Sequence, residues 1–223
     1  MDKRYERNIG ALTQTEQELL QTKKAAVIGC GGLGCYIAEF LARIGLGHLT
    51  LIDGDVFAQS NLNRQLYALE TNPGKNKALE AGERLLQIRS NLSLNVIDVF
   101  LTNKNAGEVL KGHDVIIDAL DNVKARLLVE KTAHTLEIPL VHGAVEGWNA
   151  QVCTVFPGDF TLSMLYPADN EPDKPSVLSF TPAFCASLQA SEAVKVLLKK
   201  ENVLRKKLLI ADLKEMTFDI VEF

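Results

Sequence analysis

The sequence predicts an α/β protein built around a doubly wound, mostly parallel β-sheet. Short apolar runs of strand length alternate with longer segments of helical periodicity between residues 25 and 143. A glycine-rich turn joins the first apolar run to the helical segment that follows it. Hydrophobic residues make up 47% and charged residues 23% of the 223-residue chain, which is an ordinary balance for a globular protein with a sizeable core.

The first part of the chain predicts a helix followed by a βαβ unit. Thr13 and Glu16 have the spacing of a capping box, which favours a short helix through about residue 23. The apolar runs 25–28 and 48–53 are typical of buried strands. The helix predicted between them has an apolar face made of Leu33, Ile37, Leu41 and Ile44. Two parallel strands need such a crossover, so the three segments form one unit.

The alternation of strands and helices continues to the middle of the chain. We expect helices at 75–89 and 122–137, strands at 94–100 and 115–118, and a further strand that begins at 139. This order is typical of a doubly wound sheet.

Beyond residue 143 the pattern changes. The segment 157–182 is rich in proline and acidic residues and has no clear period, which is more typical of a functional loop than of a core element. Thr181 before Pro182 predicts the N-cap of a helix, with proline at its first position. Strands that extend the sheet in antiparallel orientation are expected at 151–156, 208–211 and 217–221.

The turn after the first strand reads GCGGLG at 29–34 and matches G-x-G-x-x-G. Glycines allow a tight turn and a close approach of the backbone to phosphate, while the following helix N-terminus faces the anion. Asp53 ends the second strand, 19 residues after Gly34, where an acid accepts hydrogen bonds from ribose. The pattern predicts a Rossmann-like nucleotide site. The alternative is that the glycines only allow close helix–strand packing, and on these features alone the expected nucleotide is NAD.

A dense polar segment after Asp53 favours ATP over NAD. Arg64 can bind phosphate oxygens through its guanidinium fork, and Asn61 and Gln65 add neutral hydrogen-bonding groups. Lys77 can supply a second positive charge. Taken singly, Arg64 is more typical of a surface ion pair and Lys77 of a solvated helix charge, so the prediction depends on their combination.

Asp121 follows the predicted strand 115–118, at the edge of an open α/β sheet where ligands bind. Its carboxylate is a suitable oxygen ligand for Mg²⁺. Alone, Asp121 with Asn122 is more typical of a helix cap. Asp55 also has an ordinary explanation, because it could simply turn the chain after the strand.

Together these segments resemble the ThiF/MoeB/HesA family, the bacterial relatives of ubiquitin-activating enzymes. The matching segments are RYERN at 4–8, GCGGLG at 29–34, LTLIDGDVFAQSNLNRQ at 49–65, GKNKA at 74–78, DALDNVKAR at 118–126 and SLQASEAVKVLL at 187–198. The resemblance covers nearly the whole chain. It implies a single adenylation domain over 1–223. Its expected parts are an N-terminal arm and helix (1–24), a nucleotide-binding part (25–145) and a carrier-binding part (146–223) with a crossover loop at about 157–182.

The resemblance implies a role for each matched position. The residues that would bind the nucleotide are Gly29, Gly31, Gly32, Leu33, Gly34, Asp53, Asp55, Asn61, Arg64, Gln65, Lys77, Leu120, Asp121 and Asn122. Arg64, Lys77, Asp121 and Arg7 would be catalytic, with Asp121 as the Mg²⁺ ligand. Arg7 looks like the arginine that family members lend to the partner subunit, which implies a homodimer with composite sites. Arg126 is expected to be structural or to face the carrier.

The implied reaction is the ATP-dependent adenylation of a small ubiquitin-like sulfur-carrier protein that ends in Gly-Gly. Its terminal carboxylate has a pKa of about 3.3–3.7 and is already an anion at neutral pH, so no general base is needed. Attack on the α-phosphorus of ATP forms the acyl-adenylate and releases pyrophosphate. The sulfur pathway would serve thiamine, molybdenum or tungsten cofactor or a related product.

Two departures from the family pattern concern cysteine. Many members bind structural zinc with two CxxC pairs, but residues 161–167 read TLSMLYP and none of the four cysteines forms such a pair. We therefore expect no zinc site. Some relatives carry a nucleophilic cysteine in the crossover loop, whereas 157–182 contains none. Cys185 is expected to be a small buried hydrophobe and Cys30 a tolerated loop residue, so a separate sulfur donor would attack the adenylate.

Composition and charge argue against several other functions. The net charge of −4 and the pI of about 5.6 argue against a nucleic-acid binder, and the sequence has neither a membrane span nor a secretory signal, so a cytoplasmic protein is expected. The alternatives are a relative that adenylates a tRNA base or a peptide, a non-catalytic carrier-binding partner, and an NAD-dependent dehydrogenase. For His142 and Trp148 a buried or packing role is expected.

Overall fold

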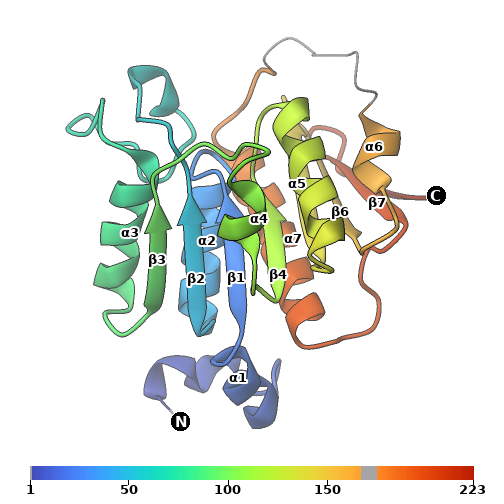
Figure 1. Ribbon diagram of the computed structural model, residues 1–223, viewed down its shortest axis with the longest axis horizontal. Helices are drawn as coiled ribbons and strands as arrows, with labels where there is room; N and C mark the ends of the chain where they lie inside the picture. Colours follow the sequence, from blue (N-terminus) through green and yellow to red (C-terminus); the bar gives the residue numbers. More distant parts are fainter. Residues whose placement is uncertain (1, 167–174) are drawn as a thin grey trace.

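The centre of the molecule is one eight-stranded sheet, seen in the computed structural model, which describes residues 2–166 and 175–223 (Figure 1). The strand order is β3-β2-β1-β4-β5-β6-β7-β8. The strands are β1 Lys24–Ile28, β2 His48–Ile52, β3 Ser93–Ile97, β4 Val115–Asp118, β5 Leu140–Glu146, β6 Asn149–Val155, β7 Lys207–Asp212 and β8 Thr217–Glu222. The first five pair in parallel, and β6, β7 and β8 extend the sheet antiparallel, which confirms the predicted fold class.

Helices cover both faces of the sheet. They are η1 Lys3–Asn8, α1 Gln14–Leu20, α2 Gly34–Ile44, η2 Gln59–Asn61, α3 Lys77–Ile88, α4 Ala106–Leu110, α5 Val123–Thr135, α6 Thr161–Leu165 and α7 Phe180–Leu197. Buried side chains of α2, α3 and α7 form one apolar core against the sheet, and those of α4, α5 and α6 form a second core on the opposite face. The central strands β1, β2 and β4 are therefore buried on both faces, which explains their continuous apolar runs.

The helices and strands predicted from local sequence patterns mostly agree with the structure to within a few residues. The Thr13–Glu16 capping box forms as predicted, although α1 ends at Leu20 rather than near residue 23. Strand β3 ends at Ile97 and not at residue 100, because the chain turns there and the Val99 N–H donates to the Ile97 carbonyl. The short helices η1, η2, α4 and α6 were not predicted, since each has too few residues to show a period.

The predicted N-cap at Thr181 is wrong. Helix α7 begins at Phe180, and the Thr181 hydroxyl donates to the carbonyl of Gly147 instead, 2.8 Å away. Pro182 thus lies in the first turn, where its missing N–H breaks no helical hydrogen bond. Part of the predicted irregular loop forms α6, and residues 167–174 of it lie outside the described residues.

The turn between β1 and α2 depends on glycine at two positions. Gly29 has a φ of +93°, and a Cβ there would lie 2.6 Å from the carbonyl oxygen of Ala119. A Cβ on Gly34 would lie 1.7 Å from the carbonyl oxygen of Gly29. Both neighbours are backbone atoms that cannot rotate away, so the strand end and the helix start can approach only without side chains.

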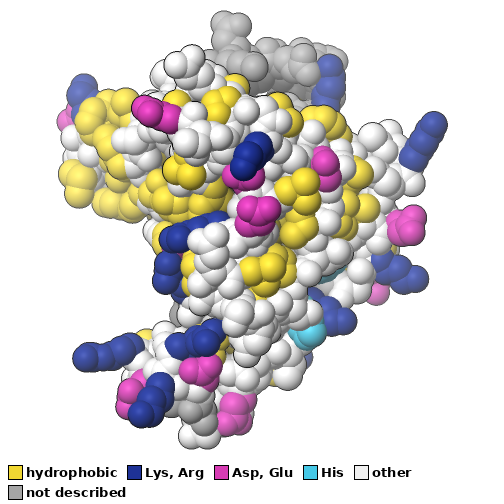
Figure 2. All heavy atoms as spheres, turned by 90° about the vertical axis from the view of Figure 1, so that its left-hand side faces the viewer, with side chains coloured by type: hydrophobic (Ala, Val, Ile, Leu, Met, Phe, Trp, Pro, Cys, Tyr) yellow, Lys and Arg dark blue, Asp and Glu magenta, His cyan; other side chains and the backbone are white. Residues whose placement is uncertain are grey.

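The N-terminal segment closes the opposite end of the sheet. The side-chain amides of Asn8 and Gln17 both donate to the carbonyl of Ile44, at the C-terminal end of α2. Figure 2 shows this segment as a lobe at the bottom of the molecule, with Lys and Arg side chains beside Asp and Glu. The whole length of α2 therefore separates this lobe from the glycine turn.

The turn geometry predicts the effect of two alanine substitutions. Gly34→Ala should lower the free energy of unfolding by at least about 2 kcal/mol, because its methyl group overlaps fixed backbone. Gly107→Ala in α4 is the matched control, since a Cβ there meets nothing within 4 Å. Alanine should be neutral or stabilising by up to about 1 kcal/mol at that position. Urea denaturation measures both, and equal midpoints would contradict the prediction.

Candidate nucleotide site

The predicted site residues gather at the carboxyl edge of the parallel strands. The glycine loop follows β1, Asp53 follows β2, Asp118 is the last residue of β4 and Asp121 comes after it, and β1 lies between β2 and β4 in the sheet. The strand order runs from β1 through β2 to β3 on one side and continues with β4 and β5 on the other side of β1. The edge between β1 and β4 is therefore the topological switch point, where open α/β sheets bind ligands.

Asp53 holds the glycine loop in place. Its carboxylate accepts a hydrogen bond from the Cys30 N–H at 2.7 Å and another from the Asp55 N–H at 2.9 Å. Burial raises the pKa of Asp53, and these two hydrogen bonds act in the opposite direction. The first role of this carboxylate is therefore structural, and contact with ribose would use its remaining lone pairs.

The loop has an open cradle at its two middle glycines. A Cβ on Gly31 would lie 3.4 Å from the side-chain nitrogen of Gln65, and one on Gly32 would lie 3.5 Å from Pro182 of α7. Gln65 is 7% exposed, and its side-chain oxygen has no hydrogen-bond partner among the described residues. A buried acceptor left unpaired is costly, so this oxygen fits a ligand that donates to it. The cradle and the unpaired oxygen fit a nucleotide.

The loop after β2 holds Arg64 beside this cradle. The Arg64 guanidinium donates to the carbonyl of Ser60 at 3.0 Å and to the Asn63 side chain at 2.8 Å. Asn61, predicted to line the site, is buried, and its side-chain oxygen accepts from the Ala58 N–H at 2.9 Å. Asn61 thus shapes the loop, and Arg64 is the cation that this loop presents next to Gly32, with its Cγ 3.8 Å from the Cβ position there.

Lys77 begins α3 and points back to the end of β2. Its ammonium group is nearly buried and forms an ion pair with Asp55 at 2.5 Å. Asp55 therefore does more than turn the chain. Asn76 caps α3 through the Leu79 N–H and also donates to the carbonyl of Asp53 at 3.1 Å. These contacts fasten the start of α3 to the strand end beside the cradle.

Asp121 presents its carboxylate to solvent at this edge. It is exposed and makes no hydrogen bond or ion pair with the described residues. Asn122 caps α5 by accepting a hydrogen bond from the Ala125 N–H, which is the helix-cap role that the sequence predicted as the alternative. Within the described part of the chain, no group of three His, Cys, Asp or Glu side chains could hold a metal ion. One carboxylate nevertheless fits Mg²⁺, which takes most of its ligands from phosphates and water.

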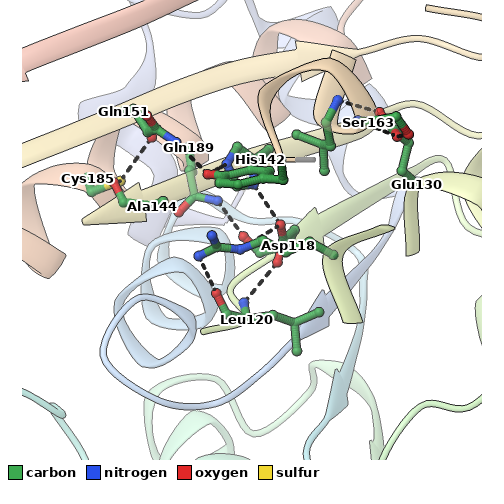
Figure 3. Close-up of polar contacts among 12 residues, drawn as sticks. Asp118, Leu120, Glu130, His142, Ala144, Gln151, Ser163, Cys185 and Gln189 are labelled. Atoms are coloured by element: carbon green, nitrogen blue, oxygen red, sulfur yellow. Dashed lines mark hydrogen bonds and ion pairs between the residues drawn. The ribbon is translucent and has the colours of Figure 1, made fainter. Parts of the chain in front are cut away.

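A buried polar network behind this edge was not predicted (Figure 3). Asp118 is fully buried, and its carboxylate contacts Nδ1 of His142 at 2.7 Å. Nε2 of His142 contacts the Tyr166 hydroxyl at 2.9 Å. Arg126 is buried, donates to the carbonyl of Leu120 at 2.7 Å and lies 3.8 Å from Asp118, so of its two predicted roles the structural one is observed. Nothing local in the sequence indicates that these residues meet.

The thiols are unsuited to nucleophilic chemistry. All four cysteines are buried, and burial raises the pKa of Cys185 to about 12. The thiolate is the reactive form of cysteine, and a thiol with such a raised pKa is almost entirely protonated at neutral pH. Cys185 behaves as the small buried hydrophobe that was expected.

The remaining predicted residues lie apart from the cradle. Arg7 is exposed on η1, in the lobe at the far end of α2, so it does not join the site of its own chain. Trp148 packs against Phe180 with ring centroids 5.1 Å apart but is 43% exposed, whereas His142 is fully buried. Two surface hollows, of about 460 and 390 Å³, contain none of the predicted site residues.

The chain is similar in sequence to known proteins over most of its length. A model of the ThiF family matches residues 5–223. The SAMP-activating enzyme E1 of Haloferax volcanii is 33% identical over 213 residues, which are 93% of this chain and 79% of that protein. The sulfur carrier protein adenylyltransferase of Thermus thermophilus is 33% identical over 91% of this chain and 79% of its own length. The adenylyltransferase and sulfurtransferase MOCS3 of Dictyostelium discoideum is 32% identical, and the chain spans only 48% of it.

Solved structures share the fold. E. coli MccB with ATP has a TM-score of 0.85 at 23% identity, over 100% of this chain and 72% of that one. PaaA has a TM-score of 0.82 at 23% identity, over 99% and 82%. Among the described helices, none is both long and apolar enough to cross a bilayer.

The buried histidine predicts a pH dependence of stability. Burial lowers the pKa of His142 below its ordinary value of 6.5, so below pH 6.5 the unfolded chain takes up a proton that the folded chain resists. The free energy of unfolding should fall by up to about 1.4 kcal/mol per pH unit from 6.5 down to the folded pKa. His142→Asn should lose this contribution. Denaturation at several pH values measures it, and identical slopes in both proteins would contradict the assignment.

Proposed function

The chain belongs to the ThiF family, and from this premise we propose that it is an ATP-dependent adenylyltransferase. Its substrate would be the C-terminal Gly-Gly carboxylate of a small ubiquitin-like sulfur-carrier protein. The observation that supports this most directly is the cradle of Gly31 and Gly32, which has the buried, unpaired Gln65 oxygen on one side and Arg64 on the other. The printed names of two relatives, a SAMP-activating enzyme and a sulfur carrier protein adenylyltransferase, support the same reaction class.

The chemistry requires charge neutralisation more than proton transfer. A carboxylate oxygen of the carrier forms a bond to the α-phosphorus of ATP, the bond to the bridging oxygen breaks, and pyrophosphate leaves. Both reactants are anions, so the barrier is repulsion and alignment. Arg64 and Lys77 would bind the phosphates, and Lys77 would exchange its contact with the exposed Asp55 carboxylate for one with phosphate. Mg²⁺ held by Asp121 would supply further positive charge.

Arg7 would act in the site of a second subunit. It lies at the opposite end of its own sheet from the glycine loop, so it could reach a cradle only in another copy of the chain. This supports a homodimer with composite sites. The division into an arm (1–24), a nucleotide-binding part (25–145) and a carrier-binding part (146–223) is proposed on the same basis.

The reaction of this chain would end at the acyl-adenylate. The four thiols are buried, so transfer of sulfur would need a separate donor that attacks the adenylate. We propose a cytoplasmic role in thiamine, molybdenum or tungsten cofactor or related sulfur metabolism.

Pyrophosphate exchange tests the reaction and the partner together. With ATP, Mg²⁺ and a panel of small Gly-Gly carriers, exchange should appear with one carrier and disappear when its last glycine is deleted. Exchange that survives the deletion would refute the requirement for an intact Gly-Gly end, and silence across the panel would favour a tRNA base or a peptide as acceptor, or a non-catalytic partner.

Two substitutions test the site residues. Arg64→Ala and Asp121→Ala should each lower exchange at least about a hundredfold while leaving the fold intact, because each removes a charge that acts on the reacting phosphates. Lys104→Ala, on an exposed loop, is the control and should change exchange by less than about twofold. Wild-type turnover in either folded mutant would remove that residue from the mechanism.

A direct titration separates ATP from NAD. ATP with Mg²⁺ should bind and NAD should not, and Arg64→Ala should weaken the binding of ATP. Calorimetry measures the binding of both ligands, and preferential binding of NAD would favour the hypothesis of an NAD-dependent dehydrogenase.

A further inference from the structure

We propose that Tyr166 and His142 are positioning residues of the adenylation site, which act through Asp118 on the loop that carries Asp121. The inference rests on the proposed function, because it concerns the same site. Its basis is a continuous line of hydrogen bonds that runs from β6 through Tyr166, the residue after α6, and β5 to the end of β4 (Figure 3).

The line has a single direction, which the donor groups determine. The side-chain nitrogen of Gln151 can only donate, and it contacts the Tyr166 hydroxyl oxygen at 2.5 Å. The Asp118 carboxylate can only accept, so Nδ1 of His142 carries a proton and donates to Asp118 at 2.7 Å. Nε2 of the neutral ring then carries no proton and accepts from the Tyr166 O–H at 2.9 Å. The structure thus assigns one tautomer to the histidine.

Burial favours the protonation states of Tyr166 and His142 that this direction requires. Burial raises the pKa of Tyr166 to about 12, so its O–H is retained at neutral pH. Burial also lowers the pKa of His142, which favours the neutral ring. The charged groups that face the histidine are Asp118 on β4 and Arg126 and Glu130 on α5. Asp118 is the acceptor at the end of the line, and the Arg126 guanidinium lies 3.8 Å from its carboxylate.

Asp118 passes this orientation to the loop before Asp121. One carboxylate oxygen contacts His142, and the other accepts from the Leu120 N–H at 2.9 Å. The carbonyl of Leu120 accepts from Arg126 at 2.7 Å, so the residue next to Asp121 is held at both of its backbone polar groups. A carboxylate that lost His142 could rotate and release the Leu120 N–H, and the position of Asp121 would become less defined.

A purely space-filling role would not need these polar groups. The Tyr166 ring already lies beneath Arg126, with the guanidinium carbon 5.1 Å from the ring centroid, and phenylalanine would keep that contact. The hydroxyl adds only the link between Gln151 and His142. Buried polar groups in series are costly unless all are satisfied, and in exchange they hold one arrangement of the chain.

Tyr166→Phe isolates the link because it removes one oxygen and keeps the ring. In the full-length protein, kcat for carrier-dependent pyrophosphate exchange should fall about tenfold and the Mg²⁺ concentration for half-maximal exchange should rise about tenfold. KM for ATP should change by less than about twofold, because the cradle is untouched. Tyr36→Phe is the matched control. The Tyr36 hydroxyl makes no hydrogen bond within the described residues, and its ring lies 6.3 Å from that of Phe40.

Two histidine variants identify which nitrogen matters. The amide nitrogen of asparagine can take the place of Nδ1 and still donate to Asp118, but it does not reach Tyr166, so His142→Asn should lose no more than the about tenfold in kcat expected for Tyr166→Phe. The amide of glutamine reaches the place of Nε2 and leaves Asp118 without its donor, so His142→Gln should lose clearly more kcat than His142→Asn. Equal effects of the two variants, or the reverse order, would overturn the proposal.

Readouts without substrate complete the test. In the ligand-free protein, nitrogen NMR should show His142 protonated at Nδ1, and amide exchange of Leu120 should be about tenfold faster in Tyr166→Phe than in Tyr36→Phe. Unchanged Leu120 exchange together with unchanged kcat would refute the positioning role alone. A wild-type protein without pyrophosphate exchange, but with the expected NMR and amide-exchange results, would instead refute the proposed function and show that the line serves only to order the loop.

Discussion

The contact on which the rest of the site depends is the close approach of backbone to backbone at the β1–α2 turn. Side chains at positions 29 and 34 would collide with carbonyl groups of Ala119 and Gly29, so only glycine lets the strand end, the helix start and the β4 loop meet. This approach leaves Gly31 and Gly32 open beneath Arg64, Gln65 and Pro182. The cradle is therefore a consequence of packing that only glycine permits.

Most carboxylates at this edge serve as scaffold. Asp53 binds the backbone of the glycine loop, Asp118 binds the backbone before Asp121, and Asp55 pairs with Lys77. Each shapes a loop that follows a different strand, which suits an edge where the loops have no regular secondary structure to hold them. Asp121 has no hydrogen-bond or ion-pair partner among the described residues, and Arg64 lies beside the cradle, which is the arrangement that the proposed charge-driven catalysis requires.

The later part of the chain completes the earlier part. Helix α7 contributes Pro182 to the wall of the cradle, and Gln189 donates to the carbonyl of Asp118 at 2.8 Å. Gln151 and Tyr166, also from the later part, begin the hydrogen-bond line that ends at Asp118. The proposed division of the chain at about residue 145 therefore separates two roles and not two structural units, since one sheet and shared contacts join the two parts.

The sequence alone determined the sheet, the glycine loop and the polar cluster beside it, because these depend on signals within a few residues. Apolar periodicity, a capping box at Thr13 and a glycine spacing each act locally, so they survive without knowledge of the fold. The tertiary structure decided which groups meet across the chain. Thr181 caps no helix because the Gly147 carbonyl lies nearby, and Asn61 caps its own turn. His142 joins Asp118 and Tyr166 because strand register and helix packing bring them within hydrogen-bond distance, and no local pattern records a contact between distant residues.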